Sequence, residues 1–166
     1  MIRRFALAAL LMPLLASCGL RPMYAGGESG PVASSLSAIS VAPIPERAGW
    51  LMRNALIDRL GGENRQAPYR LEVDLDDDIS GFGIRGDRSV TRERRTLRAR
   101  YRLVQASSGL VLLDATAGSD AGIDVVSSPY ATVAAEQTAL ERLSRVVADQ
   151  IVARLALYAS SRPIGQ

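Results

Sequence analysis

Acidic side chains gather in one short segment of the 166-residue chain, at Glu72, Asp74, Asp76, Asp77 and Asp78. Such a cluster could bind calcium, but it lacks the Asp-x-Asp-x-Asp-Gly loop that ends in glutamate, and its first members alternate along an expected strand. Two carboxylates would also suffice for glycoside hydrolysis if one of them stayed protonated. Because arginines follow closely in the sequence, we expect every carboxylate to be ionised. The cluster therefore predicts neither a metal site nor a catalytic acid.

Arginines gather in the next segment, where eight of them between residues 85 and 102 stand against only Asp87 and Glu93. A hairpin centred near Asp87 would place the two charged segments side by side, with facing residue numbers that add up to 174. Its facing pairs would be Glu72 with Arg102, Asp74 with Arg100, and Asp76 with Arg98. Each exposed cross-strand pair contributes ~0.2–1 kcal/mol. One interpretation of the arginines is therefore a purely structural ion ladder.

A second interpretation adds a ligand. Arginines 92, 94, 98, 100 and 102 have even numbers, so on one strand they would share a face. The ladder provides no acidic partners for Arg92, Arg94 and Arg95. It provides none for Arg85 and Arg88 either. The planar guanidinium group suits phosphate recognition. The candidate phosphate-binding residues are Arg92, Arg94, Arg95, Arg98 and Arg100.

Other residue types exclude most enzyme classes. The chain has no histidine, which removes the commonest general base, the imidazole metal ligands and the Ser-His-Asp arrangement. Its one cysteine, Cys18, allows neither an internal disulfide nor a thiolate metal cluster. We expect a protein that is not an enzyme and that needs no cofactor.

The N-terminus has the layout of a secretory signal peptide, with Arg3 and Arg4 before an apolar run too short to span a bilayer. The run ends in Leu15-Ala16-Ser17-Cys18, which resembles a bacterial lipobox. We predict cleavage after residue 17 and acylation of Cys18. Because Gly19 follows it instead of aspartate, we expect sorting to the outer membrane. The alternatives are a plain signal peptide with a chance cysteine and a buried N-terminal helix.

Removal of the leader changes the charge of the protein. The whole chain carries a net charge of +3, and loss of Arg3 and Arg4 lowers it to +1. A nearly neutral, secreted chain has no electrostatic reason to bind nucleic acid. We expect no nucleic-acid partner.

Hydropathy patterns divide the mature chain into elements. Residues 18–35 are rich in Gly, Pro and Ser, so we expect the acylated cysteine followed by a flexible tether. Alternating apolar residues predict strands over 38–42, 69–76, 96–104 and 110–116, and the last one is apolar on both faces and therefore central or covered. Connections are expected at 80–89 and 119–128.

Two helices are predicted over 46–60 and 130–159. The first has a stripe of Met52, Leu56 and Leu60, and the second a stripe of Val133, Leu140, Leu143, Val147, Ile151, Leu155 and Tyr158. The order β-α-β-β-β-α indicates an α+β domain in which two helices pack on one face of a four-stranded sheet. This domain would span residues 36–160, with a tail at 161–166.

Several motifs resemble one known family. Cys18-Gly19-Leu20-Arg21-Pro22-Met23-Tyr24 is similar to the Cys-Gly-Phe-x-Pro-Leu-Tyr start of the LPS-assembly lipoproteins, LptE, with Leu20 and Met23 as mild departures. Later similarities are Ser128-Pro129-Tyr130-Ala131, Glu136-Gln137 and Ile151-x-x-x-Leu155. The resemblance implies two helices against a four-stranded sheet and a role without catalysis.

The resemblance also implies partners. Members of this family sit inside the lumen of the outer-membrane β-barrel LptD, help it to fold, and bind lipopolysaccharide. The basic segment has no motif firm enough to transfer individual binding residues. Two alternatives stay open: a lipid-anchored accessory module of a periplasmic ABC-type lipid transport system, and a lipid-anchored hydrolase, for which the chain offers no recognisable nucleophile.

Overall fold

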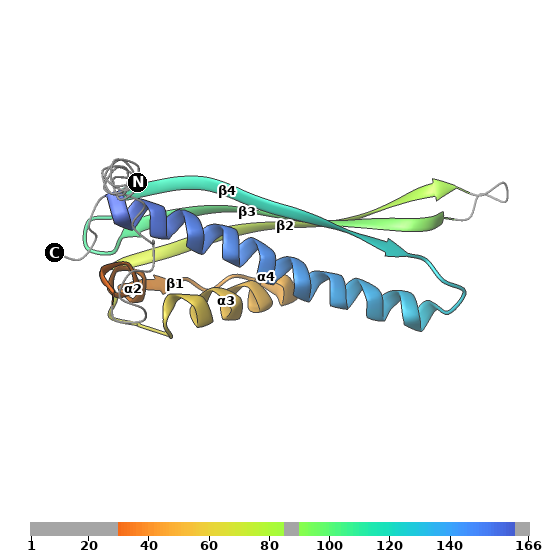
Figure 1. Ribbon diagram of the computed structural model, residues 1–166, viewed down its shortest axis with the longest axis horizontal. Helices are drawn as coiled ribbons and strands as arrows, with labels where there is room; N and C mark the ends of the chain where they lie inside the picture. The colour runs from red at the N-terminus through yellow and green to blue at the C-terminus, as the bar shows by residue number, and fades with distance from the viewer. Residues whose placement is uncertain (1–29, 85–89, 162–166) are drawn as a thin grey trace, which may run out of the picture.

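The structure, a computed structural model, describes residues 30–84 and 90–161. The predicted leader, Cys18, most of the tether, and Arg85 and Arg88 lie outside these residues. The elements are α2 (Pro31–Ser37), β1 (Ile39–Val41), α3 (Glu46–Leu60), β2 (Tyr69–Ile84), β3 (Val90–Gln105), β4 (Val111–Asp124) and α4 (Pro129–Ser161). Figure 1 shows three long strands that run along the length of α4.

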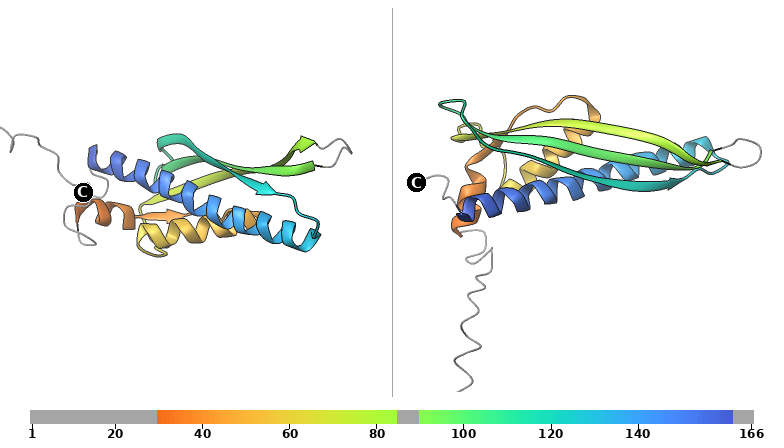
Figure 2. Two further views of the ribbon diagram at one scale, coloured as in Figure 1. Left: turned by 45° about the vertical axis from the view of Figure 1, so that its right-hand side comes forward. Right: turned by 90° about the horizontal axis from the view of Figure 1, so that it is seen from above.

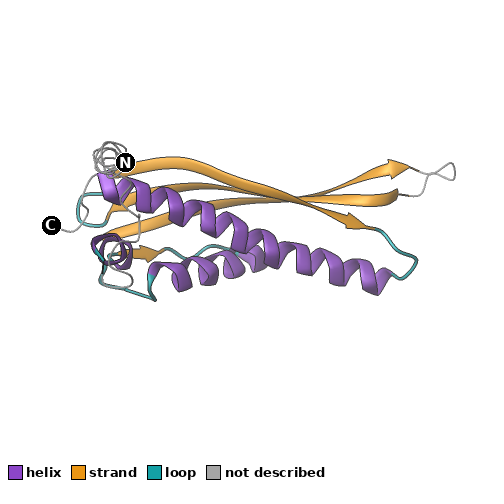
Figure 3. Cartoon of the chain, viewed as in Figure 1, coloured by secondary structure: helices purple, strands orange, loops and turns teal. Residues whose placement is uncertain are grey.

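The four strands form one mixed sheet in the order β1-β2-β3-β4. The short strand β1 pairs parallel with the start of β2, and the two other pairings are antiparallel. Both α3 and α4 lie on the same side of this sheet (Figures 2 and 3). The predicted fold class, α+β with two helices on one face of a four-stranded sheet, is confirmed.

The core lies between this sheet face and the helices. Odd-numbered side chains of β2 and β3 face the helices, and Leu71, Leu97 and Leu103 among them are completely buried. Opposite them lie the predicted stripes of α3 and α4, and Met52, Val147 and Ile151 are likewise fully buried. Because strand side chains alternate between faces, burying one parity exposes the other. The helices therefore fix which face of the sheet stays uncovered.

Two expectations about the helical regions are wrong. Val133, placed on the core stripe, is 49% exposed, because the first turns of α4 extend beyond α3 (Figure 1). Part of the expected tether, from Pro31 onward, forms α2. Proline is favoured at the first position of a helix, and Leu36 of α2 is buried in the core.

The long strands extend further than their apolar patterns. Residues 80–84 continue β2, and residues 119–124 continue β4, although both were expected to be connections. Glycine, serine and aspartate in these stretches indicate loops locally, but cross-strand pairing with β3 overrides that preference. Gly83 has φ +76°, and a Cβ there would lie 2.9 Å from Thr91 Oγ1, so the end of β2 requires glycine.

The run at 110–116 was expected to be central or covered, because it is apolar on both faces; the structure shows that it is not central and is only partly covered. Strand β4 is the edge strand of the sheet, and Leu110 and Val111 are 59% and 45% exposed. Its next residues, Leu112, Leu113 and Ala115, are partly buried and pack against the core. A register irregularity beside Leu103 and Val104 marks the start of this strand.

The buried stripe of α4 can be tested with a matched pair of substitutions. Val147→Asp puts a charge where the side chain is completely buried, so we expect the free energy of unfolding to fall by about 3 kcal/mol or more. Arg145→Asp, on the exposed side, should change it by about 0.5 kcal/mol. Urea denaturation measures both, and equal stability of the two variants would contradict the packing.

Candidate functional site

The candidate site is the sheet face turned away from α3 and α4, here called the outer face. It is formed by the even-numbered side chains of β2, β3 and β4. The predicted register is confirmed, since Glu72 faces Arg102, Asp74 faces Arg100, and Asp76 faces Arg98. Five arginines of β3 share this face, as their parity indicated: Arg92, Arg94, Arg98, Arg100 and Arg102.

The ion pairs follow the register only in part. Arg102 reaches Glu72 at 3.2 Å, as expected. Arg100 instead turns to β4, where Nε and Nη2 donate to Asp114 at 3.1 and 2.8 Å. This hydrogen bonding lowers the pKa of Asp114 and raises that of Arg100. The arginines of β3 therefore form ion pairs with carboxylates on both neighbouring strands, β2 and β4.

The expectation that Arg92, Arg94 and Arg95 lack acidic partners is wrong. Arg92 pairs with Asp124 at 3.2 Å, and Arg94 lies 3.9 Å from Asp120. Both aspartates belong to the part of β4 that had been expected to form a loop. Both pairs are solvent-exposed, so each contributes at most about 1 kcal/mol.

Arg95 differs from the other candidates because it lies on the inner face. Its Nε and Nη2 donate to Asp77 at 2.8 and 2.5 Å, and Nη1 donates to the Glu136 carbonyl of α4 at 2.9 Å. The Arg95 and Asp77 side chains are only 11% and 19% exposed. The hydrogen bond to Asp77 raises the pKa of Arg95, against the effect of burial. Arg95 thus fastens the first half of α4 to the sheet.

Among the candidate arginines, Arg98 is the one without an ion pair in the described part of the chain. Its side chain lies beside Gly118 of β4, where a Cβ would come within 3.4 Å of Arg98 Cγ. Arg98 and Arg100 line a hollow of about 650 Å³ together with three aspartates, Asp74, Asp76 and Asp120. Of the two arginines in this hollow, Arg98 is thus the one whose guanidinium makes no ion pair with a described residue.

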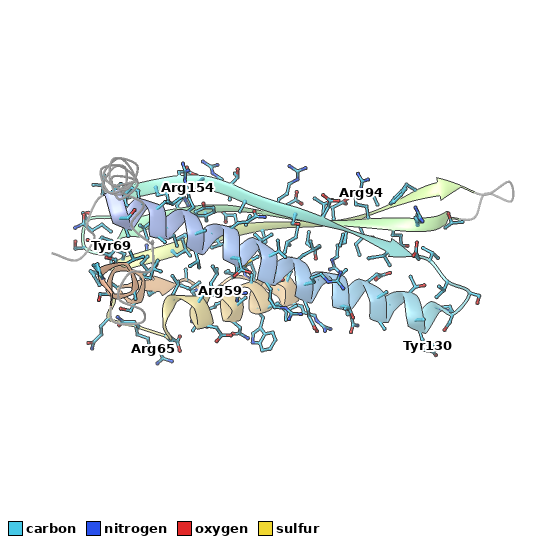
Figure 4. All side chains as sticks on the ribbon, viewed as in Figure 1. Arg59, Arg65, Tyr69, Arg94, Tyr130 and Arg154 are labelled. Atoms are coloured by element: carbon cyan, nitrogen blue, oxygen red, sulfur yellow. The ribbon has the colours of Figure 1, made fainter. Side chains whose placement is uncertain are left out.

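One contact at the far end of this face was missed from the sequence. Arg94 stacks over the ring of Phe82, with 5.3 Å between the guanidinium carbon and the ring centroid. Figure 4 shows Arg94 near the end of the sheet that is distant from the carboxyl end of α4. The parity argument, extended past residue 80, would have placed Phe82 on the outer face. Because Phe82 is 39% exposed, this end combines an apolar ring with positive charge.

The acidic cluster is divided between the two faces of the sheet. Asp77 points inward to Arg95, while Asp74, Asp76 and Asp78 lie on the outer face. Within residues 30–84 and 90–161, no group of three or more candidate ligand side chains could hold a metal ion. In the same residues, no helix is both long and apolar enough to cross a membrane.

The fold of this domain is also found in solved structures of bacterial lipoproteins. A candidate lipoprotein from Caulobacter crescentus CB15 is 26% identical and superposes with a TM-score of 0.69, over 80% of this chain and all of that one. Rare lipoprotein B from Shewanella oneidensis shares the fold at 11% identity, with a TM-score of 0.55 over 74% and 95% of the two chains. The fold is thus one that lipoproteins use.

The family follows from the sequence comparison. The lipopolysaccharide-assembly family LptE matches residues 36–155, and the chain belongs to this family. An uncharacterized protein of Rickettsia prowazekii (strain Madrid E) is 28% identical over 154 residues, which cover 93% of this chain and 96% of that one. LptE is a family of non-enzymatic lipoproteins, and membership supports a role in lipopolysaccharide assembly.

The inner-face pair gives a direct test of the site geometry. Arg95→Ala strands the half-buried Asp77 carboxylate, so we expect the free energy of unfolding to drop by about 2 kcal/mol or more. Arg92→Ala removes an exposed pair and should cost less than about 1 kcal/mol. Thermal or urea unfolding distinguishes them, and a smaller loss for Arg95→Ala than for Arg92→Ala would refute the assignment.

Proposed function

We propose that this chain is an outer-membrane lipoprotein that plugs the lumen of the LptD β-barrel and assists its assembly. In this role it contributes to the insertion of lipopolysaccharide at the outer membrane. The observation that carries the proposal is the uncovered outer face, whose charges alternate across three long strands of an LptE-family domain. Barrel interiors are polar, so a plug must present a polar surface rather than an apolar one.

The dimensions of the sheet support this role. β2 and β3 are 16 residues long, which at about 3.3 Å per residue gives roughly 50 Å. The hydrocarbon core of a bilayer is about 30 Å thick. A plug aligned with the axis of the barrel would therefore fill the lumen and still reach the periplasm.

The barrel partnership is tested by affinity purification from detergent-solubilised envelopes. The proposal expects a large β-barrel protein to copurify with the full, acylated chain, and expects the pair to stay together in detergent. Recovery of the chain with ABC-transporter components instead would support the alternative role as an accessory module of a lipid transport system.

The anchor is a separate part of the proposal, because Cys18 lies outside the described residues. The lipobox ending in Ser17-Cys18 supports cleavage after residue 17 and acylation of the new N-terminus. Acyl chains contribute about 0.8 kcal/mol per buried methylene, so three of them would hold the domain permanently at the membrane. The intact mass of the purified protein should show loss of residues 1–17 and gain of acyl chains. A mature chain that begins elsewhere, or a free Cys18 thiol, would contradict the anchor.

We also propose that the outer face binds phosphate groups of lipopolysaccharide, with Arg98 as the first contact. Arg98 has no ion pair to break within the described residues, and Arg100 lies beside it in the same hollow. Arg92 and Arg94 could join at small cost, because exposed ion pairs are weak. Arg95 is not available, since Asp77 and the Glu136 carbonyl occupy its guanidinium.

Lipopolysaccharide binding by Arg98→Ala tests this contact. A hydrogen bond to a charged group contributes about 1.5–3 kcal/mol, so the affinity should fall about tenfold or more. The effect should shrink from 0.1 M to 1 M salt, because the Debye length falls from about 10 Å to about 3 Å. Arg65→Ala is the control, since Arg65 is 86% exposed on a different part of the chain. Unchanged binding by a stably folded Arg98→Ala variant at low salt would refute the contact.

A further inference from the structure

The free side of β4 has the properties of a strand-pairing surface. In the described part of the chain, β4 is the last strand of the sheet, and 13 of its 14 residues pair with β3 while its other side pairs with no strand. Gly118 N–H points away from β3, because it donates to the Gln150 side chain of α4 at 3.2 Å. The register with β3 is regular from Asp124 to Leu113, so the N–H groups of even residues such as Thr116 and Asp120 point the same way. We call this side the β4 edge.

The middle of the β4 edge has one protected backbone group in the described residues, Gly118 N–H, which donates to the Gln150 side chain of α4. Edge strands are usually shielded by lysine, proline or a bulge. Residues 115–119 read Ala-Thr-Ala-Gly-Ser, and the register irregularity lies at the start of the strand instead. The small side chains here do not cover the other backbone groups of the edge, such as the Thr116 and Asp120 N–H groups.

Hollows lie on both sides of the β4 edge. The outer hollow, of about 650 Å³, includes Arg98 and Arg100, and an inner hollow of about 470 Å³ includes Tyr101 and Arg154. Both are lined by Thr116, Ala117 and Gln150, so they meet at the edge. An added strand would lie about 4.8 Å from β4 and send its side chains alternately to the two faces. The two hollows provide room for such side chains.

The chemistry of the inner hollow indicates what it would bind. Arg154 of α4, shown beside β4 in Figure 4, makes no ion pair with any described residue. Tyr101 is 98% buried, yet its hydroxyl makes no hydrogen bond within residues 30–84 and 90–161. Gln150 accepts from Gly118 through Oε1, which leaves its amide nitrogen as a donor. A guanidinium, a phenol and an amide together suit a carboxylate.

A second copy of this chain does not fit this requirement. If two β4 edges paired, each would offer the inner hollow of the other its inward side chains, which are Leu113, Ala115, Ala117, Ser119, Ala121 and Ile123. None of these is acidic. The charge of the inner hollow therefore favours a different polypeptide, one with an acidic residue at the matching position.

We propose that the β4 edge binds an extended segment of the barrel partner as a fifth strand, with an acidic side chain of that segment held by Arg154, Gln150 and Tyr101. This inference rests on the proposed barrel partnership for the identity of the segment. The added strand would pair with the edge groups other than Gly118 N–H, which Gln150 already occupies. The acidic residue is inferred from the donors of Arg154, Gln150 and Tyr101. Such strand addition is an established mode of peptide recognition.

Amide hydrogen exchange at single-residue resolution tests the proposal on the full, acylated chain, alone and in the copurified complex. We expect the Thr116 amide to exchange at least tenfold more slowly in the complex. The control amide is that of Ile79 in β2, on the opposite side of the sheet from β4. Its N–H points away from β3, and β1 pairs only with residues 69–71 of β2, so this amide should stay unprotected in both samples. Equal exchange of Thr116 in both samples would overturn the proposal.

A second experiment substitutes Arg154, one of the residues that line the inner hollow. Arg154→Gln should reduce the protection of Thr116 in the complex at least threefold, whereas Arg142→Gln, which also replaces an exposed arginine of α4, should leave it unchanged. Full protection in the Arg154→Gln complex would overturn the acidic contact. If the chain copurifies with a protein other than a barrel and this protein protects Thr116, the barrel partnership is refuted, but the β4 edge is still supported as a strand-binding site. Recovery without any protein partner would contradict both.

Discussion

The register of β2 against β3 decides which side chains the helices meet. Facing residues add up to 174 along the whole pairing, from Tyr69 opposite Gln105 to Ile84 opposite Val90. A slip of one residue would turn Arg98 and Arg100 toward α4 and expose Leu97 and Ala99 instead. The hydrophobic core, the charged outer face and the position of β4 all follow from this pairing.

The inner face carries one charged exception to that pattern. Beyond Leu75 and Leu97 the inward positions become Asp77 and Arg95, which neutralise each other, and Arg95 also donates to the Glu136 carbonyl of α4. This arrangement lets the sheet continue past the apolar core while α4 stays attached. A long sheet with one bare face is the result, and a polar barrel lumen is an environment in which such a face needs no further cover.

Local patterns predicted much of the fold because the deciding interactions are close in sequence. The first helix was predicted with its observed bounds, Glu46–Leu60, since its apolar stripe and Gly61, with φ +94°, define it locally. The β2–β3 register followed from charge alternation around one turn. The far half of β4 could not be predicted, because Gly118, Asp120 and Gly122 become strand residues only through distant pairing with β3.

The same distant pairing explains the errors at the site. Partners for Arg92 and Arg94 come from β4, about 30 residues later, so charge counting around the hairpin could not find them. The parity of Arg95 did distinguish it from the even-numbered arginines, and an odd position on this strand indicates the inner face. The donors of the inner hollow, Tyr101, Gln150 and Arg154, come from β3 and α4 and share no local motif.

The central claim, that the chain assists assembly of the LptD barrel, is tested most directly by depleting it from cells and following the barrel in the outer membrane. Folded barrels resist unfolding by detergent at room temperature, so their mobility on gels before and after heating reports assembly. The account predicts that depletion leaves the barrel unfolded or absent, and that the wild-type chain restores it. A barrel that assembles normally without the chain would contradict the account.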